Sequence, residues 1–163
     1  MNTIILFTDG AVPNNQIKGN RNGGIGVFFG DDDPRNISEG FNETPTLKVT
    51  NQVCELLACI KGIEKLITTQ KIVNIIIKTD SMYIVNTINV WAKKWEKNNW
   101  KKSDNKIIQN ENLVKQLYYL SLNFNIKFEH VKAHTQQPEK ESPEYFNWYG
   151  NYMADKLAVL ASN

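Results

Sequence analysis

TIILFTDG, residues 3–10, is the stretch of this chain from which its fold can be predicted. The residues from Ile4 to Phe7 are all apolar, and such a continuous run predicts a strand that is buried on both faces of a sheet. The strand ends on an acid, Asp9, followed by Gly10. Open sheets bind ligands at the ends of their central strands, so Asp9 is a candidate site residue. A turn or cap role for Asp9 is an equally good interpretation of this stretch alone.

Composition sets the broad class of the protein. The chain has 163 residues, of which 41% are hydrophobic and 22% charged, and this length predicts one domain, residues 1–163, with a sizeable core. The sequence contains neither a transmembrane run nor a signal-peptide pattern, so we expect no membrane partner. Cys54 and Cys59 fall on different faces of a predicted helix, which disfavours a disulfide or a metal pair. We expect both cysteines to be buried as small hydrophobic side chains. We expect the protein to lie in a reducing intracellular compartment, the cytoplasm or the nucleus.

Two more acids lie where a site could form. The spacing of apolar residues predicts a helix over 50–67, and Glu55 lies beside its apolar stripe, where an ordinary surface position is the alternative. A second buried strand, predicted over 71–79, ends on Asp80. Asp80 could be the N-cap of the next helix, but two central strands that both end in Asp favour a shared site.

The remaining elements are separated by turn-rich segments. We predict strands over 25–29, 36–41 and 126–131, and helices over 110–122 and 145–160.

Lysines alternate with tryptophans over residues 90–106, VWAKKWEKNNWKKSDNK. Trp91 and Trp95 share one face of a predicted helix, and packing of that face against the protein body accounts for both. This packing does not explain why lysines concentrate here in a chain whose net charge is only +2. Binding to nucleic-acid phosphates does explain it.

The sheet and two helices could bring together Asp9, Glu55, Asp80 and Asp155. Four clustered carboxylates repel one another and therefore need divalent cations. Oxygen ligands suit Mg²⁺ or Mn²⁺, and the lack of a Cys or His cluster disfavours zinc. Two such ions would activate a water and stabilise the leaving oxygen of a phosphodiester. His134, after the last predicted strand, could relay a proton or help the product leave.

Seven motifs in this order and spacing resemble ribonuclease H type 1 over essentially the whole chain. They are FTDG at 7–10, GGIG at 23–26, TNQVCELLA at 50–58, TDSMYI at 79–84, the tryptophan–lysine segment, HVKAH at 130–134 and GNYMADKLA at 150–158. The resemblance implies an α/β, RNase H-like fold: a five-stranded mixed sheet, with three antiparallel strands and then two parallel ones, and helices on both faces. It also implies an endonuclease that cleaves the RNA strand of RNA–DNA hybrids with two Mg²⁺ ions, for which Mn²⁺ would substitute. The expected product ends are a 5′-phosphate and a 3′-hydroxyl.

The resemblance assigns catalytic roles position by position. Asp9, Glu55, Asp80 and Asp155 match the four metal-ligating carboxylates of the family. His134 matches the histidine of its flexible loop.

Substrate-binding roles are implied in the same way. Three residues fall where the family reads 2′-hydroxyls in the minor groove: Asn15, Asn51 and Gln52. Three fall where it grips a phosphate of the DNA strand: Lys48, Thr50 and Asn110. Residues 90–106 resemble the family's basic protrusion, and the candidates there to bind the DNA strand are Trp100, Lys101 and Lys102. Asn151 matches a polar residue near the catalytic histidine.

Two segments depart from the family pattern. The first hairpin loop, 13–23, is longer than in compact bacterial members, and the stretch 134–155 is extended. Three aromatic residues in that stretch either pack the final helix or lengthen a substrate-facing loop: Tyr145, Phe146 and Trp148. We expect a monomer without an N-terminal hybrid-binding domain.

Two other functions stay open on the sequence alone. One is a different nuclease of the same fold, such as a junction resolvase. The other is a hybrid-binding module without catalysis, which the presence of all four acids and His134 disfavours.

Overall fold

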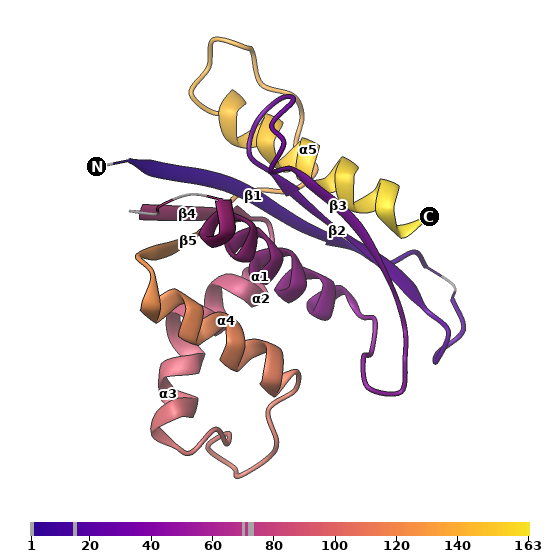
Figure 1. Cartoon of the computed structure of the whole chain (residues 1–163), viewed down its shortest axis with the longest axis vertical. Coiled ribbons are helices and arrows are strands. Elements are labelled where there is room, and N and C mark those ends of the chain that lie inside the picture. The colour runs from indigo at the N-terminus through magenta and orange to yellow at the C-terminus, as the bar shows by residue number, and fades with distance from the viewer. Residues whose placement is uncertain (1, 15, 70, 72–73) are drawn as a thin grey trace.

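A computed structural model of the chain describes residues 2–14, 16–69, 71 and 74–163. It has an α/β fold in which helices cover both faces of a five-stranded mixed sheet (Figure 1). The strands are β1 (Thr3–Ala11), β2 (Asn22–Phe28), β3 (Ile37–Asn42), β4 (Asn74–Thr79) and β5 (Ile126–His130). Their order in the sheet is β3-β2-β1-β4-β5; β1, β2 and β3 pair antiparallel, whereas β4 pairs parallel with both β1 and β5. This topology confirms the predicted fold class.

One long helix lies on each face of the sheet (Figure 1). The face covered by α1 (Asn51–Thr69) also carries α2 (Met82–Asn86), the π-helical turn η1 (Thr87–Trp91), α3 (Ala92–Lys97) and α4 (Glu111–Asn123). The opposite face is covered by α5 (Tyr145–Ser162). Within the described ranges, no helix has the length and apolarity needed to cross a membrane.

β1 is buried on both faces, as its sequence predicts. Leu6 is fully buried and faces α1, where Gly62 leaves room for its side chain. The next residue, Phe7, is 3% exposed and faces α5, where its ring lies against Gly150. Both helical layers therefore pack against β1.

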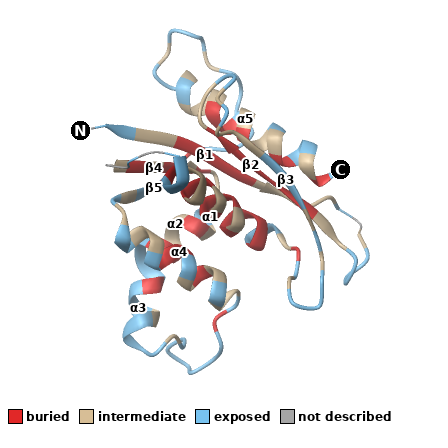
Figure 2. Ribbon diagram, in the orientation of Figure 1, coloured by how far each residue is buried: buried red, intermediate tan, exposed pale blue. Residues whose placement is uncertain are grey.

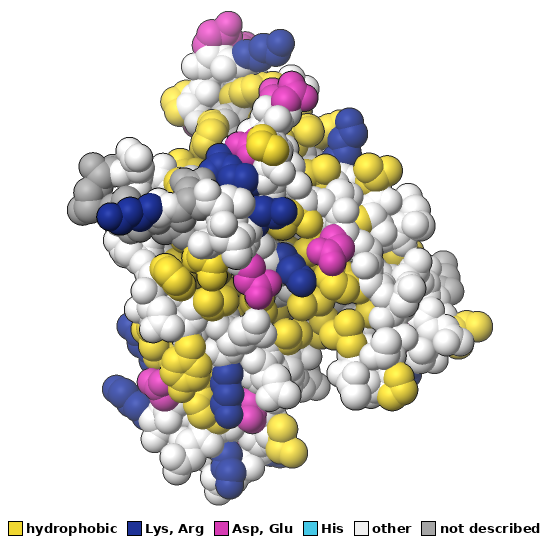
Figure 3. Space-filling view, viewed as in Figure 1, with side chains coloured by type: hydrophobic (Ala, Val, Ile, Leu, Met, Phe, Trp, Pro, Cys, Tyr) yellow, Lys and Arg dark blue, Asp and Glu magenta, His cyan; other side chains and the backbone are white. Residues whose placement is uncertain are grey.

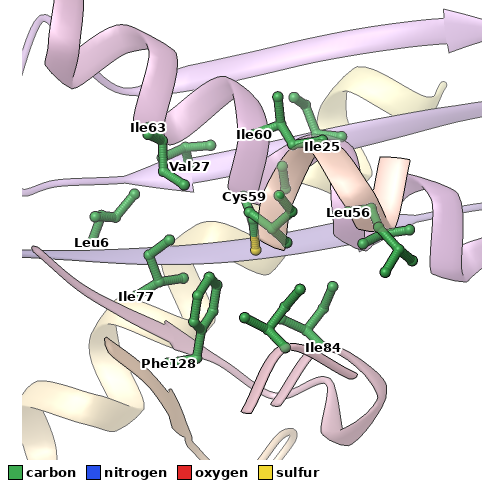
Figure 4. Close-up of a cluster of buried hydrophobic side chains, with 14 of the residues drawn as sticks. Leu6, Ile25, Val27, Leu56, Cys59, Ile60, Ile63, Ile77, Ile84 and Phe128 are labelled. Carbon is green, nitrogen blue, oxygen red and sulfur yellow. The ribbon is translucent and has the colours of Figure 1, made fainter. Parts of the chain in front are cut away.

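The larger core lies between α1 and the sheet (Figure 4). Its fully buried side chains include Leu56 and Ile63 from α1, Ile25 and Val27 from β2, and Ile77 from β4. Burial is concentrated in the central strands and α1, whereas α3 is mostly exposed (Figure 2). Both cysteines belong to this core, as predicted for small apolar side chains.

Helix α5 approaches β2 closely because β2 has glycines on that face. A Cβ atom on Gly24 would lie 2.6 Å from the backbone nitrogen of Ser162, and one on Gly26 would lie 2.7 Å from that of Ala158. We call Gly24 and Gly26 the glycine seam. Gly26 is the antiparallel partner of Asp9, so the close approach at the glycine seam places α5 next to the part of β1 that carries Asp9.

Strand β4 is less buried than its sequence predicts. Ile75 and Ile77 are buried, but Ile76 and Lys78 are only half-buried, because α5 lies mainly over β1 and β2. The predicted strand also included residues 72–73, which lie outside the described residues.

The predicted packing of two tryptophans is correct for one of them. Trp95 packs against the main core, whereas Trp91 is 39% exposed, although their ring centroids are 6.1 Å apart. The turn before α3 is π-helical, with a hydrogen bond from the Ala92 N–H to the Thr87 carbonyl. A π-helical turn holds more residues than an α-helical one, so the positions before it are rotated relative to those that follow.

Candidate active site

Four carboxyl groups meet at the edge of the sheet where β4 ends. β1 does not end at Asp9 as predicted but continues to Ala11, so Asp9 lies within the strand. Asp9, Glu55 and Asp80 each have one carboxylate oxygen that lies within 4.8 Å of the corresponding oxygens of the other two. Asp155, from α5, borders the same cavity and hydrogen-bonds with Asp9. The structure thus gathers the four acids that the sequence singles out.

Parallel pairing of β1 and β4 places two of these acids side by side. Thr8 is the partner of Thr79, so the next residue in each chain segment, Asp9 and Asp80, lies at the same level of the sheet. The alternative role of Asp80 as a helix N-cap is wrong. Ser81 is the N-cap of α2, and its hydroxyl accepts the Ile84 N–H at 3.2 Å.

Glu55 reaches the site from the second turn of α1. Its Oε1 accepts the backbone N–H of Gly10, which also donates to Oδ1 of Asp9 at 2.9 Å. Gly10 itself is required by close packing, because a Cβ there would lie 2.7 Å from the Cβ of Cys54. Glu55 is 8% exposed, so its alternative placement at the surface is wrong.

The acids line an open cavity of about 340 Å³. Asn51, Gln52, Ser81 and His134 complete most of its wall. None of the described residues that line it is Lys or Arg. The protein therefore supplies no cationic side chain in the cavity wall to balance its carboxylates.

Burial and mutual repulsion disfavour the charged forms of these carboxyl groups. Burial, followed by the charge of Glu55, raises the pKa of Asp9 to about 11. Burial also raises the pKa of Glu55 to about 7. Burial raises the pKa of Asp80, against the opposing effect of a hydrogen bond from Asn151. To ionise all of these groups, the cavity needs a cation.

The donor set fits a hard divalent cation. All three clustered ligands are carboxylate oxygens, the ligand type that Mg²⁺ and Mn²⁺ prefer. Their raised pKa values show that the cluster is electrostatically unsatisfied by the protein alone. Asn151 is buried next to Asp80, and its side-chain oxygen has no hydrogen-bond partner among the described residues.

The N-terminus of α1 forms the adjoining rim. Asn51 and Gln52 are exposed and line the cavity. Thr50 caps the helix, with its hydroxyl accepting the Val53 N–H at 3.1 Å. Glu43, which was not predicted as a site residue, accepts the N–H groups of Gly19 and Val49, and so ties the first hairpin loop to the segment entering α1.

Two other predicted substrate-binding residues, Lys48 and Asn110, lie outside the cavity wall. Lys48 is exposed, and Asn110 is the N-cap residue of α4, with its amide 3.5 Å from the hydroxyl of Tyr83. Asn15 lies outside the described residues.

The basic segment, residues 90–106, comprises the end of η1, helix α3 and the exposed loop that follows α3. Trp100 packs edge-on against Tyr118 and Tyr119, with ring centroids 5.8 and 5.9 Å apart, while Lys101 and Lys102 are exposed. On the face shown in Figure 3, Lys and Arg side chains are spread among acidic ones and do not form a single patch.

The extended stretch before Asp155 resolves one alternative left by the sequence. Tyr145, Phe146 and Trp148 belong to the first turn of α5, and Phe146 packs on Phe7 with ring centroids 5.4 Å apart. These aromatics therefore pack the final helix. Its Trp148 also lines a second cavity, of about 250 Å³, that shares His134 and Asp155 with the first.

Sequence reasoning missed Ser81 and Trp148 as residues of this region. Ser81 carries a signal that could have been used, since a serine after a strand and before a helix is a strong N-cap candidate. Trp148 lies seven residues before Asp155, a spacing that returns to the same face of a helix.

Comparison with known proteins gives consistent results. The sequence profile of the RNase H family matches residues 1–163. A ribonuclease H from Desulforamulus reducens is 36% identical over 160 residues, which cover 98% of this chain and 87% of that protein. A ribonuclease H from Schizosaccharomyces pombe is 34% identical over 154 residues, which cover 94% of this chain. This chain spans about half the length of the latter, 51%.

Solved structures share the fold. The solution structure of the PFV RNase H domain superposes with a TM-score of 0.70 at 23% identity, covering 98% of this chain and 93% of that one. The crystal structure of LC9-RNase H1, described as a type 1 RNase H with the type 2 active-site motif, gives a TM-score of 0.70 at 20% identity and covers 98% of this chain and 72% of that one.

Proposed function

Because this chain belongs to the RNase H family, we propose that it is a ribonuclease H that hydrolyses the RNA strand of RNA–DNA hybrids. The observation that carries this proposal is the convergence of Asp9, Glu55 and Asp80, with Asp155 beside them, in one open cavity. The cavity is bordered by polar residues at the start of α1 and by His134. We assign residues 1–163 to one catalytic domain that acts as a monomer, since a single chain supplies every residue named here.

We assign Asp9, Glu55, Asp80 and Asp155 as the ligands of two Mg²⁺ ions, with Mn²⁺ as a substitute. Bound there, such ions would supply Lewis-acid chemistry, which lowers the pKa of a water and stabilises a leaving oxygen. Removal of charge repulsion among the buried carboxyl groups would favour their ionised, ligating forms.

The chain's own residues orient the reaction. Gly10 donates its N–H to both Asp9 and Glu55, and Asn151 hydrogen-bonds Asp80, so three carboxylates are held in fixed orientations. Water attacks the phosphorus, and the bond to the 3′-oxygen breaks, which leaves a 5′-phosphate and a 3′-hydroxyl. His134 lies exposed at the cavity edge, a position suited to carrying a proton to or from solvent.

Recognition of the hybrid requires different contacts to its two strands. Asn51 and Gln52 line the cavity where the cleaved strand would lie, and their amides can donate to and accept from a 2′-hydroxyl. We assign Lys48, Thr50 and Asn110 to a phosphate of the DNA strand. We assign the exposed segment with Trp100, Lys101 and Lys102 to the same strand further along the duplex; in that assignment, Asn15 joins the 2′-hydroxyl contacts.

The direct test is cleavage of matched substrates. RNA–DNA hybrid, duplex RNA, duplex DNA and a four-way DNA junction of equal length are incubated with the protein, with Mg²⁺ or with excess chelator. We expect divalent-dependent cleavage of the RNA strand of the hybrid, and none by Asp9→Asn. Preferred cleavage of the junction would indicate a resolvase. Tight hybrid binding without cleavage would indicate a non-catalytic module, and wild-type rates from Asp9→Asn would contradict the metal-ligand assignment.

A further inference from the structure

The segment that carries His134 is attached to the protein at few points. On its N-terminal side, the Val131 N–H donates to the Thr79 carbonyl at 2.9 Å, where β5 ends. On its C-terminal side, the next backbone hydrogen bond joins the Ser142 N–H to the Glu139 carbonyl within the same segment. Residues 132–137 between them are all exposed. Among the residues that the structure describes, no backbone hydrogen bond therefore fixes the position of His134.

One side chain of α5 contacts this segment. The indole Nε1–H of Trp148 donates to the carbonyl of Thr135 at 3.2 Å. Thr135 directly follows His134, whose backbone lies in the left-handed region with a φ of 51°. A non-glycine residue in this region is held at an energetic cost, so it needs neighbouring contacts that favour it. The Trp148 hydrogen bond is such a contact, one residue away.

Trp148 lies on the same face of α5 as Asp155. Residues 148, 151, 152 and 155 follow the i, i+3, i+4, i+7 spacing of one helical face, and all four line the cavity that includes His134. That face already supplies Asp155 to the acid cluster and Asn151 to Asp80. The Trp148 ring stacks on Tyr152, with centroids 5.3 Å apart, and contacts Tyr145, with centroids 5.6 Å apart.

We propose that Trp148 is a positioning residue, which tethers the His134 segment to α5 through the Thr135 carbonyl and so holds His134 over the acid cluster. The proposal rests on the proposed function, because it assigns His134 a part in cleavage. Helix α5 then carries both Asp155 and Trp148, so the position of His134 is fixed relative to the acid cluster. Trp148 acts through His134 and needs no contact with the substrate.

The test uses Trp148→Phe, which keeps an aromatic ring in the stack but removes the N–H donor. Tyr145→Phe is the matched control, because it alters the same aromatic stack without touching the tether. NMR relaxation of the intact protein is measured first, because the amides of residues 132–137 are exposed and their mobility reports the tether directly. We expect the backbone order parameters of residues 132–137 to fall in Trp148→Phe to below about 0.6, the range of flexible backbone, and to keep their wild-type values in Tyr145→Phe. Order parameters within 150–158 should stay unchanged in both variants.

Single-turnover cleavage of an RNA–DNA hybrid then tests the consequence. We expect Trp148→Phe to lower the cleavage rate about 3- to 10-fold with hybrid affinity unchanged within twofold. In a His134→Ala background, the same substitution should have no further effect, because coupled residues are not additive.

Three outcomes would overturn the proposal: unchanged order parameters of residues 132–137 in Trp148→Phe, an equal loss of rate in both backgrounds, or a His134→Ala variant that cleaves at the wild-type rate. A wild-type protein that cleaves no hybrid would instead contradict the proposed function, and the relaxation measurement would then decide the tether alone.

Discussion

Replacement of Asp9 by Asn should stabilise the metal-free protein while it abolishes cleavage. Asp9 is 5% exposed, and burial beside Glu55 raises its pKa to about 11, from 3.8 in an exposed chain. Between these values the folded state holds a proton that the unfolded state has released. The unfolded state thus binds fewer protons, so the free energy of unfolding falls as pH rises through this window.

The size of the effect follows from one proton. A difference of one bound proton changes the free energy of unfolding by about 1.4 kcal/mol per pH unit. From pH 5.5 to 7.5, Asp9 alone should therefore cost the wild type about 2.7 kcal/mol relative to Asp9→Asn. The Asn side chain keeps an oxygen to accept the Gly10 N–H, which Asp9 accepts at 2.9 Å, so the local geometry should survive.

Urea unfolding in excess chelator at several pH values measures this difference. Glu39→Gln, at an exposed acid on β3, is the control and should show the wild-type dependence on pH. Added Mg²⁺ should stabilise the wild type at pH 7.5 and leave Asp9→Asn nearly unchanged. Parallel curves of stability against pH for wild type and Asp9→Asn would refute this account of the cavity, as would an Asp9→Asn variant that is less stable at pH 7.5.

Three further predictions address binding, metal affinity and the core. Removal of Lys101 and Lys102 should weaken hybrid binding and flatten its dependence on salt, measured by anisotropy titrations; an unchanged salt slope would make this segment an ordinary solvated loop. Asn151→Ala removes the hydrogen bond that opposes the raised pKa of Asp80, so the Mg²⁺ concentration for half-maximal cleavage should rise about 10- to 100-fold; an unaltered Mg²⁺ dependence would contradict this role. Ile63→Ala, in the core, should cost about 2–5 kcal/mol in urea unfolding, and an effect below 1 kcal/mol would show that the core there is not tightly packed.

Local sequence signals were sufficient to predict most of the elements and the neighbourhood of the acids, whereas the order and direction of the strands were implied by the family resemblance. A Thr-Asp pair occurs in β1 and at the end of β4, and the two strands pair in parallel at those threonines, so the repeated sequence pattern places the two acids side by side. The same reasoning placed the helix that carries Glu55, because its apolar stripe and its Thr50 cap are both local features. The roles assigned to these residues remain predictions for the assays above.

Other features depend on tertiary contacts that periodicity does not encode. The uneven burial of β4 follows from where α5 lies, and that position depends on the glycine seam of a different strand. The exposure of Trp91 depends on a π-helical turn, for which the sequence has no simple signature. The Trp148 hydrogen bond joins residues 13 apart and is accepted by a backbone carbonyl, so it cannot be predicted from a pair of complementary side chains.

The glycine seam has a consequence for the metal site that we propose. The distance of α5 from the sheet depends on Gly24 and Gly26, neither of which is a proposed metal ligand. That distance also sets how closely Asp155 approaches Asp9. Mg²⁺ takes oxygen ligands at 2.0–2.1 Å, whereas the larger Ca²⁺ accepts 2.3–2.6 Å with looser geometry. A methyl group added at Gly26 would lift the helix and widen the gap between ligands carried by different layers. Selectivity for Mg²⁺ at the proposed site would thus depend partly on how closely α5 approaches β2.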